Sequence, residues 1–243
     1  MLRYIDHRKM GRGKHGWLDS YFHFSFAEYY NPDNMHFGVL RVINDDTVQA
    51  GEGFDTHPHQ NMEIISYVVD GELTHADSMQ NRRTLTRGQA QYMSAGTGVT
   101  HSEYNLGEGP LRFLQIWILP DRDNYAPSYG DYRFTWEDRL DKWLPIAGGS
   151  PESPGPIKIH ADINVYAAQI TGQSGGARGG ELAFEVGPER QAYLVLIEGA
   201  ARVAARSGEY TLSERDALEI TGENITVSAA DSSHLLVLEM AQL

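Results

Sequence analysis

The chain has 243 residues, a hydrophobic content of 41% and a formal net charge of -13, and it contains no cysteine. This length is enough for one large folded domain or two smaller ones. The negative charge argues against general binding of nucleic acids or acidic membranes, which needs clustered Lys and Arg, and the absence of cysteine excludes disulfides, thiolate metal sites and cysteine nucleophiles.

Strand-like segments rich in β-branched and aromatic residues dominate the sequence. In chain order they are residues 37–43, 64–69, 111–119, 165–170, 182–186, 193–197, 202–205, 225–228 and 235–240. Turn-forming residues follow several of them, as Asn-Asp-Asp at 44–46, Asp-Gly at 70–71 and Gly-Glu-Gly-Pro at 107–110. Many short strands with regular turns predict an all-β, antiparallel sandwich or barrel.

No apolar stretch of secretory length occurs in the first 14 residues. The longest apolar segment, residues 114–119, is too short to cross a bilayer. We therefore expect a cytoplasmic protein that binds neither membranes nor nucleic acids.

A segment rich in proline and glycine, residues 147–156, divides the chain. We predict an N-terminal domain of residues 1–146 and a C-terminal domain of residues 157–243. A glycine-rich stretch at 172–180 lacks the Lys-Ser/Thr ending of a phosphate loop, so it predicts a flexible hairpin loop.

The two halves of the chain resemble each other. An apolar strand ends in Asp-Gly at 63–71 and in Glu-Gly at 192–199, and a polar turn leads into a strand at 86–93 and again at 212–220. These echoes indicate a duplicated β-domain.

Two tripeptides, His57-Pro-His59 and His101-Ser-Glu103, carry most of the functional information. Residues two apart in a strand share a face, because successive side chains point to opposite faces. If the two tripeptides lie on neighbouring strands, three imidazoles and one carboxylate surround a single point. That ligand set suits a divalent transition metal. No H-x-H pair occurs after residue 156, so we expect one metal ion, in the N-terminal half.

These residues belong to a wider pattern, which closely resembles the two characteristic motifs of the cupin superfamily. The pattern is Gly51-x5-His57-x-His59-x3-Glu63, then Gly88-x5-Ser94-x-Gly96 and His101-x3-Asn105, with Ser94 in place of the usual proline. Further segments look like the pirin family, in particular its bacterial members with quercetinase activity. They are His15-Gly-Trp-Leu-Asp-Ser20, Phe24-Ser-Phe26, Leu40-Arg-Val-Ile-Asn-Asp-Asp46, His75-Ala-Asp-Ser78, Met93-Ser-Ala-Gly-Thr-Gly98 and Leu114-Gln-Ile-Trp117.

The resemblance implies an all-β bicupin fold, with two antiparallel jelly-roll barrels and one metal ion in the N-terminal barrel only. His57, His59 and His101 are the implied histidine ligands. General cupin spacing nominates Glu63 as the fourth ligand, whereas the pirin pattern nominates Glu103. We favour Glu103, because the resemblance is closest at His-Ser-Glu. Glu63 is then either a carboxylate of the pocket or one that contacts the metal ligands without binding the ion. Iron is the first choice of metal, with nickel, copper, manganese, zinc and cobalt also compatible.

The activity implied by the resemblance is the opening of the heterocycle of quercetin-like flavonols by dioxygen, with release of carbon monoxide. Glu103 or Glu63 would act as the general base. The expected partners are a planar phenolic substrate and dioxygen, and we expect a monomer. An alternative from the same family is a metal- or redox-sensing protein that acts on a regulatory protein partner. A third interpretation, a structural zinc site, conflicts mildly with the absence of cysteine.

His75 and Asp77 also lie two residues apart. Asp77-Ser78 followed by Gln80-Asn81 is typical of a hairpin turn with bonds from side chains to the backbone. We therefore interpret this pair as structural.

Overall fold

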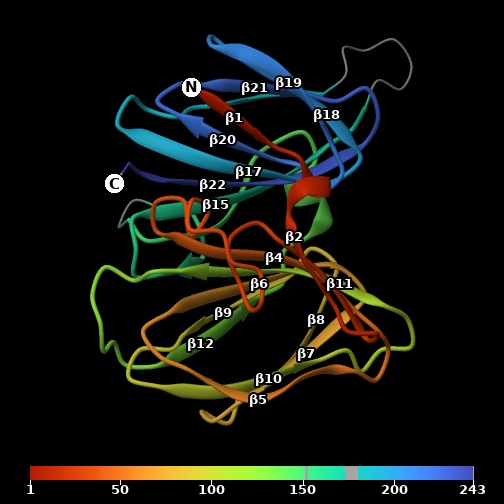
Figure 1. Ribbon diagram of the computed structural model, residues 1–243, viewed down its shortest axis with the longest axis vertical. Coiled ribbons are helices and arrows are strands. Elements are labelled where there is room, and N and C mark those ends of the chain that lie inside the picture. Colours follow the sequence, from red (N-terminus) through yellow and green to blue (C-terminus); the bar gives the residue numbers. More distant parts are fainter. Residues whose placement is uncertain (151–152, 173–179, 243) are drawn as a thin grey trace. The chain divides into compact units, whose positions relative to one another are not determined.

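The computed structural model describes residues 1–150, 153–172 and 180–242, and Figure 1 shows that strands dominate them. The helical segments in these residues are two short 3-10 turns, η1 (His7–Lys9) and η2 (Trp136–Arg139). Neither is long or apolar enough to cross a membrane. The glycine-rich hairpin predicted at 172–180 lies outside the described residues, apart from its two end positions.

The chain forms two compact units. The N-unit consists of Met10–Phe134 with Ile157–Ala161, and the C-unit consists of Met1–Lys9, Thr135–Pro156 and Asp162–Leu243. This division differs from the predicted domain of residues 1–146, because the first nine residues and residues 135–146 group with the C-unit. The first nine residues do so because the first strand forms its backbone hydrogen bonds there, with Leu2 opposite Ile220.

The N-unit contains two antiparallel sheets. The larger sheet has the strand order β12 (Ser128–Tyr132), β9 (Ala90–Ser94), β6 (Glu63–Asp70), β11 (Leu111–Ile118), β4 (Leu40–Val48), β3 (Leu18–Phe22) and β2 (Gly11–Lys14). The smaller sheet has the order β5 (Gly53–His59), β10 (Val99–Tyr104), β7 (Glu72–Asp77) and β8 (Arg82–Thr86). The two sheets are hydrogen-bonded separately, which is consistent with a jelly roll that does not close into a barrel.

A row of polar residues crosses the inner face of the larger sheet. Gln91 lies opposite Ser66, Ser66 opposite Gln115, and Gln115 opposite Asn44. We call these four residues the polar row. Apolar clusters lie on both sides of it, because each strand has apolar residues two positions before or after its polar one: Ile64 and Val68 on β6, Met93 on β9, and Phe113 and Trp117 on β11. The N-unit therefore has a polar belt between two apolar layers.

The C-unit repeats the strand order of the N-unit. Its larger sheet runs β1 (Leu2–Ile5), β20 (Ala217–Thr221), β17 (Arg190–Glu198), β22 (Ser233–Ala241), β15 (Ile163–Ile170) and β13 (Leu144–Gly148). Its smaller sheet runs β16 (Glu181–Phe184), β21 (Ile225–Ser228), β18 (Ala200–Ala205) and β19 (Gly208–Ser213). Strand β14 (Ile157–Lys158) lies in the segment that groups with the N-unit.

The duplication predicted from the sequence is visible in this topology. The order β5-β10-β7-β8 in one unit corresponds to β16-β21-β18-β19 in the other. The glycines that end the two similar segments, 63–71 and 192–199, also share a backbone conformation, since φ is 82° at Gly71 and 86° at Gly199. Glycine adopts positive φ more readily than any other residue, which explains why both segments end in glycine. The interior of the C-unit contains an apolar cluster that includes Leu194, Val203 and Val227.

The turn predicted at residues 44–46 is wrong, because strand β4 runs through all three residues. Consecutive polar residues are typical of turns, but here their side chains alternate between the two faces of the strand. Asn44 and Asp46 line a cavity inside the N-unit. Asp45 points the other way and accepts hydrogen bonds from the guanidinium of Arg112 at 2.8 and 2.6 Å.

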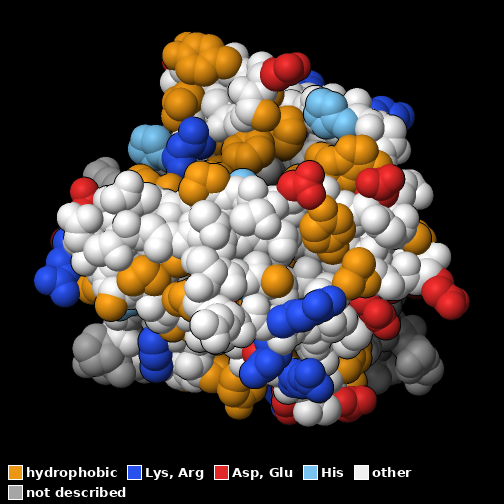
Figure 2. All heavy atoms as spheres, turned by 90° about the horizontal axis from the view of Figure 1, so that it is seen from below, with side chains coloured by type: hydrophobic (Ala, Val, Ile, Leu, Met, Phe, Trp, Pro, Cys, Tyr) orange, Lys and Arg blue, Asp and Glu red, His pale blue; other side chains and the backbone are white. Residues whose placement is uncertain are grey.

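Figure 2 shows one face of the molecule, on which basic side chains gather in a small area with acidic side chains beside them. Charges of both signs are therefore interspersed on this face.

Candidate metal centre

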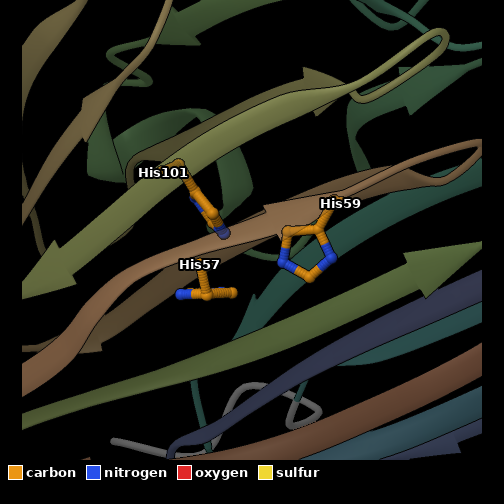
Figure 3. Close-up of side chains that lie close together, drawn as sticks. All are labelled: His57, His59 and His101. Atoms are coloured by element: carbon orange, nitrogen blue, oxygen red, sulfur yellow. The ribbon is translucent and has the colours of Figure 1, made fainter.

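Strands β5 and β10 bring three histidines together. The strands pair antiparallel with His57 opposite His101, and His59 lies two residues further along β5. The ring centroids are 4.8 Å apart for His57 and His59, 4.6 Å for His57 and His101, and 4.9 Å for His59 and His101. One nitrogen of each ring lies within 4.8 Å of the others, and Figure 3 shows the three rings turned toward one another. The three histidines thus lie together, as the spacing of the two tripeptides predicts for neighbouring strands.

The ring of His57 is oriented by its own strand. Its Nδ1 lies 2.6 Å from the backbone carbonyl of Asp55, so Nδ1–H donates to that oxygen. The lone pair then lies on Nε2, as in histidines that bind metals.

A chain of hydrogen bonds orients His101. Its Nδ1 lies 3.5 Å from Nδ1 of His75, which also lies 3.4 Å from Nε2 of Gln91. The other nitrogen of His75 lies 3.1 Å from the carboxylate of Asp77. These contacts are satisfied when His75 Nε2–H donates to Asp77 and His101 Nδ1–H donates to His75; this tautomer assignment follows from the hydrogen-bond network.

His101 Nε2 then carries a lone pair. This atom is buried and has no hydrogen-bond partner among the residues that the structure describes. Such an orphaned buried nitrogen is costly unless a ligand satisfies it. A metal ion fits this position.

Burial keeps the rings of His59 and His101 neutral. Desolvation, and then the neighbouring His57 and His75, lower the pKa of His101 to about 3. Desolvation, with His101 and His57, lowers the pKa of His59 to about 4. At neutral pH the imidazoles of His59 and His101 are therefore in the form that binds metals.

Glu103 lies on β10 beside this cluster and is 2% exposed. Its Oε1 accepts hydrogen bonds from Ser66 Oγ at 2.7 Å and Gln91 Nε2 at 2.9 Å, and its Oε2 accepts one from Gln115. Three members of the polar row thus hold one carboxylate that reaches them from the opposite sheet. One oxygen of Glu103 lies within 4.8 Å of ring nitrogens of His75 and His101.

The carboxylate of Glu63, which general cupin spacing nominates as the fourth ligand, lies elsewhere. Glu63 stands three residues before Ser66 on β6 and hence on the opposite face. Its carboxylate accepts hydrogen bonds from Ser94 Oγ at 2.6 Å and from the backbone N–H of His160 at 3.2 Å. The turn between β5 and β6 resets the alternation, since Asn61 there has a φ of 49°. The parity of His57 and His59 therefore does not carry over to Glu63.

A cavity of about 220 Å³ opens beside the histidines. Its wall includes His57, His59 and Glu103 together with apolar and polar side chains: His15, Leu18, Ser20, Phe22, Phe26, Ala27, Asn44, Asp46, Phe54, Gln115 and Trp117. The ring of Trp117 packs edge-on against that of His59, with centroids 4.8 Å apart. A small planar molecule in this cavity would contact the histidines directly.

The predicted hairpin bonds at Asp77 are present, because its Oδ1 accepts from the backbone N–H groups of Met79 and Asn81 at 2.9 and 3.0 Å. The interpretation of His75 as only structural missed its contact with His101. Its ring is fully buried and stacks on Tyr129, with centroids 4.6 Å apart. The signal in the sequence was the spacing of His75 and Asp77, which puts both side chains on the face that His101 shares.

The C-unit contains another cluster of a histidine and two aspartates, namely His7, Asp6 and Asp216. Asp216 accepts hydrogen bonds from Tyr4 Oη at 2.7 Å and from the backbone N–H of His7 at 3.0 Å. Asp6 binds the guanidinium of Arg8. These bonds attach β1 to its sheet, so the cluster has a structural role.

Comparison with known proteins finds matches along most of the chain. Residues 5–118 match a family model described as Pirin, and residues 148–240 match one described as Quercetinase C-terminal cupin domain. A quercetin 2,3-dioxygenase of Escherichia coli K12 is 37% identical over 233 residues, which is 95% of this chain and 94% of the relative. A pirin-like protein of Caulobacter vibrioides is 38% identical over 234 residues, which is 96% of this chain and 97% of the relative.

Among solved structures, the bacterial pirin YhhW from Escherichia coli in complex with nickel(II) superposes with a TM-score of 0.89 at 33% identity, covering 100% of both chains. The predicted fold, all-β with two cupin-type domains, is confirmed by these matches and by the strand order of the two units.

Proposed function

The chain belongs to the pirin family, and from this premise we propose that it is a metal-dependent dioxygenase that opens the heterocycle of quercetin-like flavonols and releases carbon monoxide. One observation carries the proposal. Three histidines converge, two of them, His57 and His59, line a cavity, and the Nε2 atom of His101 has no hydrogen-bond partner in the described part of the chain. The name of the Escherichia coli relative, quercetin 2,3-dioxygenase, supports it.

His57, His59 and His101 would hold one divalent ion, with Glu103 as the fourth ligand. The nickel complex of the related YhhW supports a divalent ion in this fold. Imidazole and carboxylate ligands also accept iron, copper, manganese, zinc and cobalt, and we retain iron as first choice. When bound, such an ion supplies a positive charge that stabilises the deprotonated 3-hydroxyl of a flavonol and lowers its pKa.

Glu103 has a second role in this proposal, as the acceptor of the substrate proton. Each carboxylate oxygen offers two lone pairs. Ser66 and Gln91 occupy both positions on Oε1, whereas Gln115 occupies only one on Oε2. The remaining lone pair of Oε2 is the position at which Glu103 reaches the ion or accepts the proton of a hydroxyl group.

The cavity excludes water from the reacting oxygen through apolar side chains such as Leu18, Phe22 and Phe26. Its volume of about 220 Å³ is below the roughly 300–1,000 Å³ of pockets for drug-sized ligands. A whole flavonol therefore extends beyond this volume, whereas a smaller enol fits inside it. Small enols consequently belong in the substrate panel.

The test is an assay of full-length protein loaded with each divalent metal in turn, measuring dioxygen uptake and carbon monoxide release. We expect quercetin to be consumed only with dioxygen and metal, with activity lost on chelation and restored by the ion. Flavones that lack the 3-hydroxyl should not react, because they have no anionic oxygen to place on the ion. Consumption of quercetin without dioxygen, or at the same rate after chelation, rejects the dioxygenase and favours the metal- or redox-sensing binding protein.

A further inference from the structure

The cavity has a polar wall that the proposed chemistry does not use. It is formed by Ser20 on β3 and by Asn44 and Asp46 on β4. Asn44 and Asp46 lie two residues apart and share the inner face of the strand. Ser20 lies opposite Asp46 in the register of β3 and β4. None of the three belongs to the histidine cluster described above.

Asn44 is the member of the polar row that Glu103 does not engage. The other three members, Gln91, Ser66 and Gln115, donate hydrogen bonds to that carboxylate. Asn44 is only 4% exposed, and its Oδ1 is buried without a hydrogen-bond partner among the described residues. A buried amide oxygen that is left unpaired destabilises the folded state, because it has lost its hydrogen bonds to water without replacement. A polar residue in this state, on the wall of a cavity, indicates a ligand group that donates a hydrogen bond.

Asp46 provides a second acceptor next to it. The residue is 3% exposed, and Ser20 Oγ donates a hydrogen bond to its Oδ1. Among the described residues, Ser20 is the one side chain that hydrogen-bonds this carboxyl group. Ser20 therefore fixes the carboxyl group with one oxygen left for a ligand in the cavity. Burial raises the pKa of Asp46 to about 7, so near neutral pH the group can accept a hydrogen bond or donate one.

We propose that Asn44 and Asp46, with Ser20 holding Asp46, form a second subsite that binds a hydroxyl group of the substrate away from the oxygen held at the histidines. The inference rests on the proposed function, because it places both subsites in one cavity, which His57, His59, Asn44 and Asp46 all line. The substrate class is then a planar enol with at least one further hydroxyl group. Such a hydroxyl group donates a hydrogen bond to Asn44 Oδ1, or it donates to or accepts from the carboxyl group of Asp46.

The experiment compares two probes that share the metal-binding oxygen and differ in their other hydroxyl groups, 3-hydroxyflavone and quercetin. Their affinities for the metal-loaded, full-length protein are measured without dioxygen, by quenching of tryptophan fluorescence. The variants are Asn44→Leu and Asp46→Leu, which replace a polar group by an apolar one of similar size. Thr47→Val is the matched control, because Thr47 lies on the same strand with its side chain on the other face.

We expect each leucine variant to bind quercetin roughly three- to tenfold more weakly, as for one lost hydrogen bond. Its affinity for 3-hydroxyflavone should change less than about twofold, since that probe has no hydroxyl group besides the one placed at the metal. The control should leave both affinities unchanged. Metal content and melting temperature show whether each variant is folded, and Asp46→Asn, which keeps the shape of the side chain, replaces Asp46→Leu if the latter does not fold.

Equal losses for both probes, or no loss for either, overturn the subsite. The proposed function is tested separately, as turnover by the protein without substitutions in the presence of dioxygen. Hydroxyl-dependent binding without turnover supports the subsite and rejects the dioxygenase. Turnover whose binding step does not depend on the further hydroxyl groups supports the dioxygenase and rejects the subsite. If the protein without substitutions binds neither quercetin nor 3-hydroxyflavone, both proposals are overturned.

Discussion

The Nδ1 atoms of His75 and His101 face each other at 3.5 Å, although the two residues come from different strands, β7 and β10. Strand pairing places His75 opposite Glu103 and Asp77 opposite His101. Asp77 orients His75, and His75 orients His101. The direction of the Nε2 lone pair of His101 therefore depends on His75 and Asp77, neither of which is among the residues that line the cavity.

His75→Phe should weaken metal binding about 10- to 100-fold, as is typical when a partner of a metal ligand is removed. Phenylalanine keeps the stack on Tyr129 but has no nitrogen for Asp77 or His101. The measurement is competition for the metal against a chelator of known affinity. An unchanged affinity in a variant with the normal melting temperature would show that His75 only fills space.

His57→Ala and His101→Ala should each retain less than about a tenth of an equivalent of metal, because two imidazoles and a carboxylate remain in each case. The measurement is elemental analysis of the purified full-length variants. His36→Ala is the control, since His36 is exposed and its Nδ1 bonds only the carbonyl of Gly38 at 3.0 Å. Near-stoichiometric metal in both variants rules out the site.

Glu103→Gln should leave the domain folded, weaken metal binding at least about tenfold and strongly reduce turnover, because a neutral amide replaces a charged ligand and proton acceptor. Glu63→Gln should affect metal binding less, since Glu63 bonds Ser94 and His160 on the other face of β6. Both are measured by metal titration alongside the flavonol assay. If Glu63→Gln alone empties the site, the choice of fourth ligand is wrong.

Metal retention should be nearly constant from about pH 8 to about pH 5 and fall steeply below about pH 4, because metal binding requires neutral imidazole. Burial lowers the pKa of His59 to about 4 and that of His101 to about 3, so both rings stay neutral well below the ordinary histidine pKa. The measurement is the metal content after dialysis at each pH. Loss of the metal centred near pH 6.5, the ordinary value, contradicts this expectation.

The same lowered pKa values predict the stability of the metal-free protein. Because the folded state favours the neutral rings, their contribution is present above about pH 6.5, the unfolded value, and is lost as the pH falls toward the folded values. His101→Phe should reduce this acid sensitivity, as measured by melting temperature from pH 7 to pH 4. An identical slope in the variant shows that other groups cause it.

The sequence alone determined the features that depend on neighbouring residues. The alternation of His57 and His59 holds because both lie in one uninterrupted strand, β5. Segments of β-branched and aromatic residues became strands because their side chains pack on a pleated surface, as at 225–228, which became β21 (Ile225–Ser228). The glycines at 71 and 199 marked turns because their positive φ is accessible mainly to glycine.

Only the tertiary structure decided features that depend on distant residues. Asn44 and Asp46 form part of a strand rather than a turn because β3 and β11 satisfy their backbone hydrogen bonds and a cavity receives their side chains. Glu63 faces away from the histidines because one residue of positive φ, Asn61, resets the alternation before β6. Local sequence sets which residues share a face within a strand. Turn geometry and pairing between distant strands set which of those faces meet.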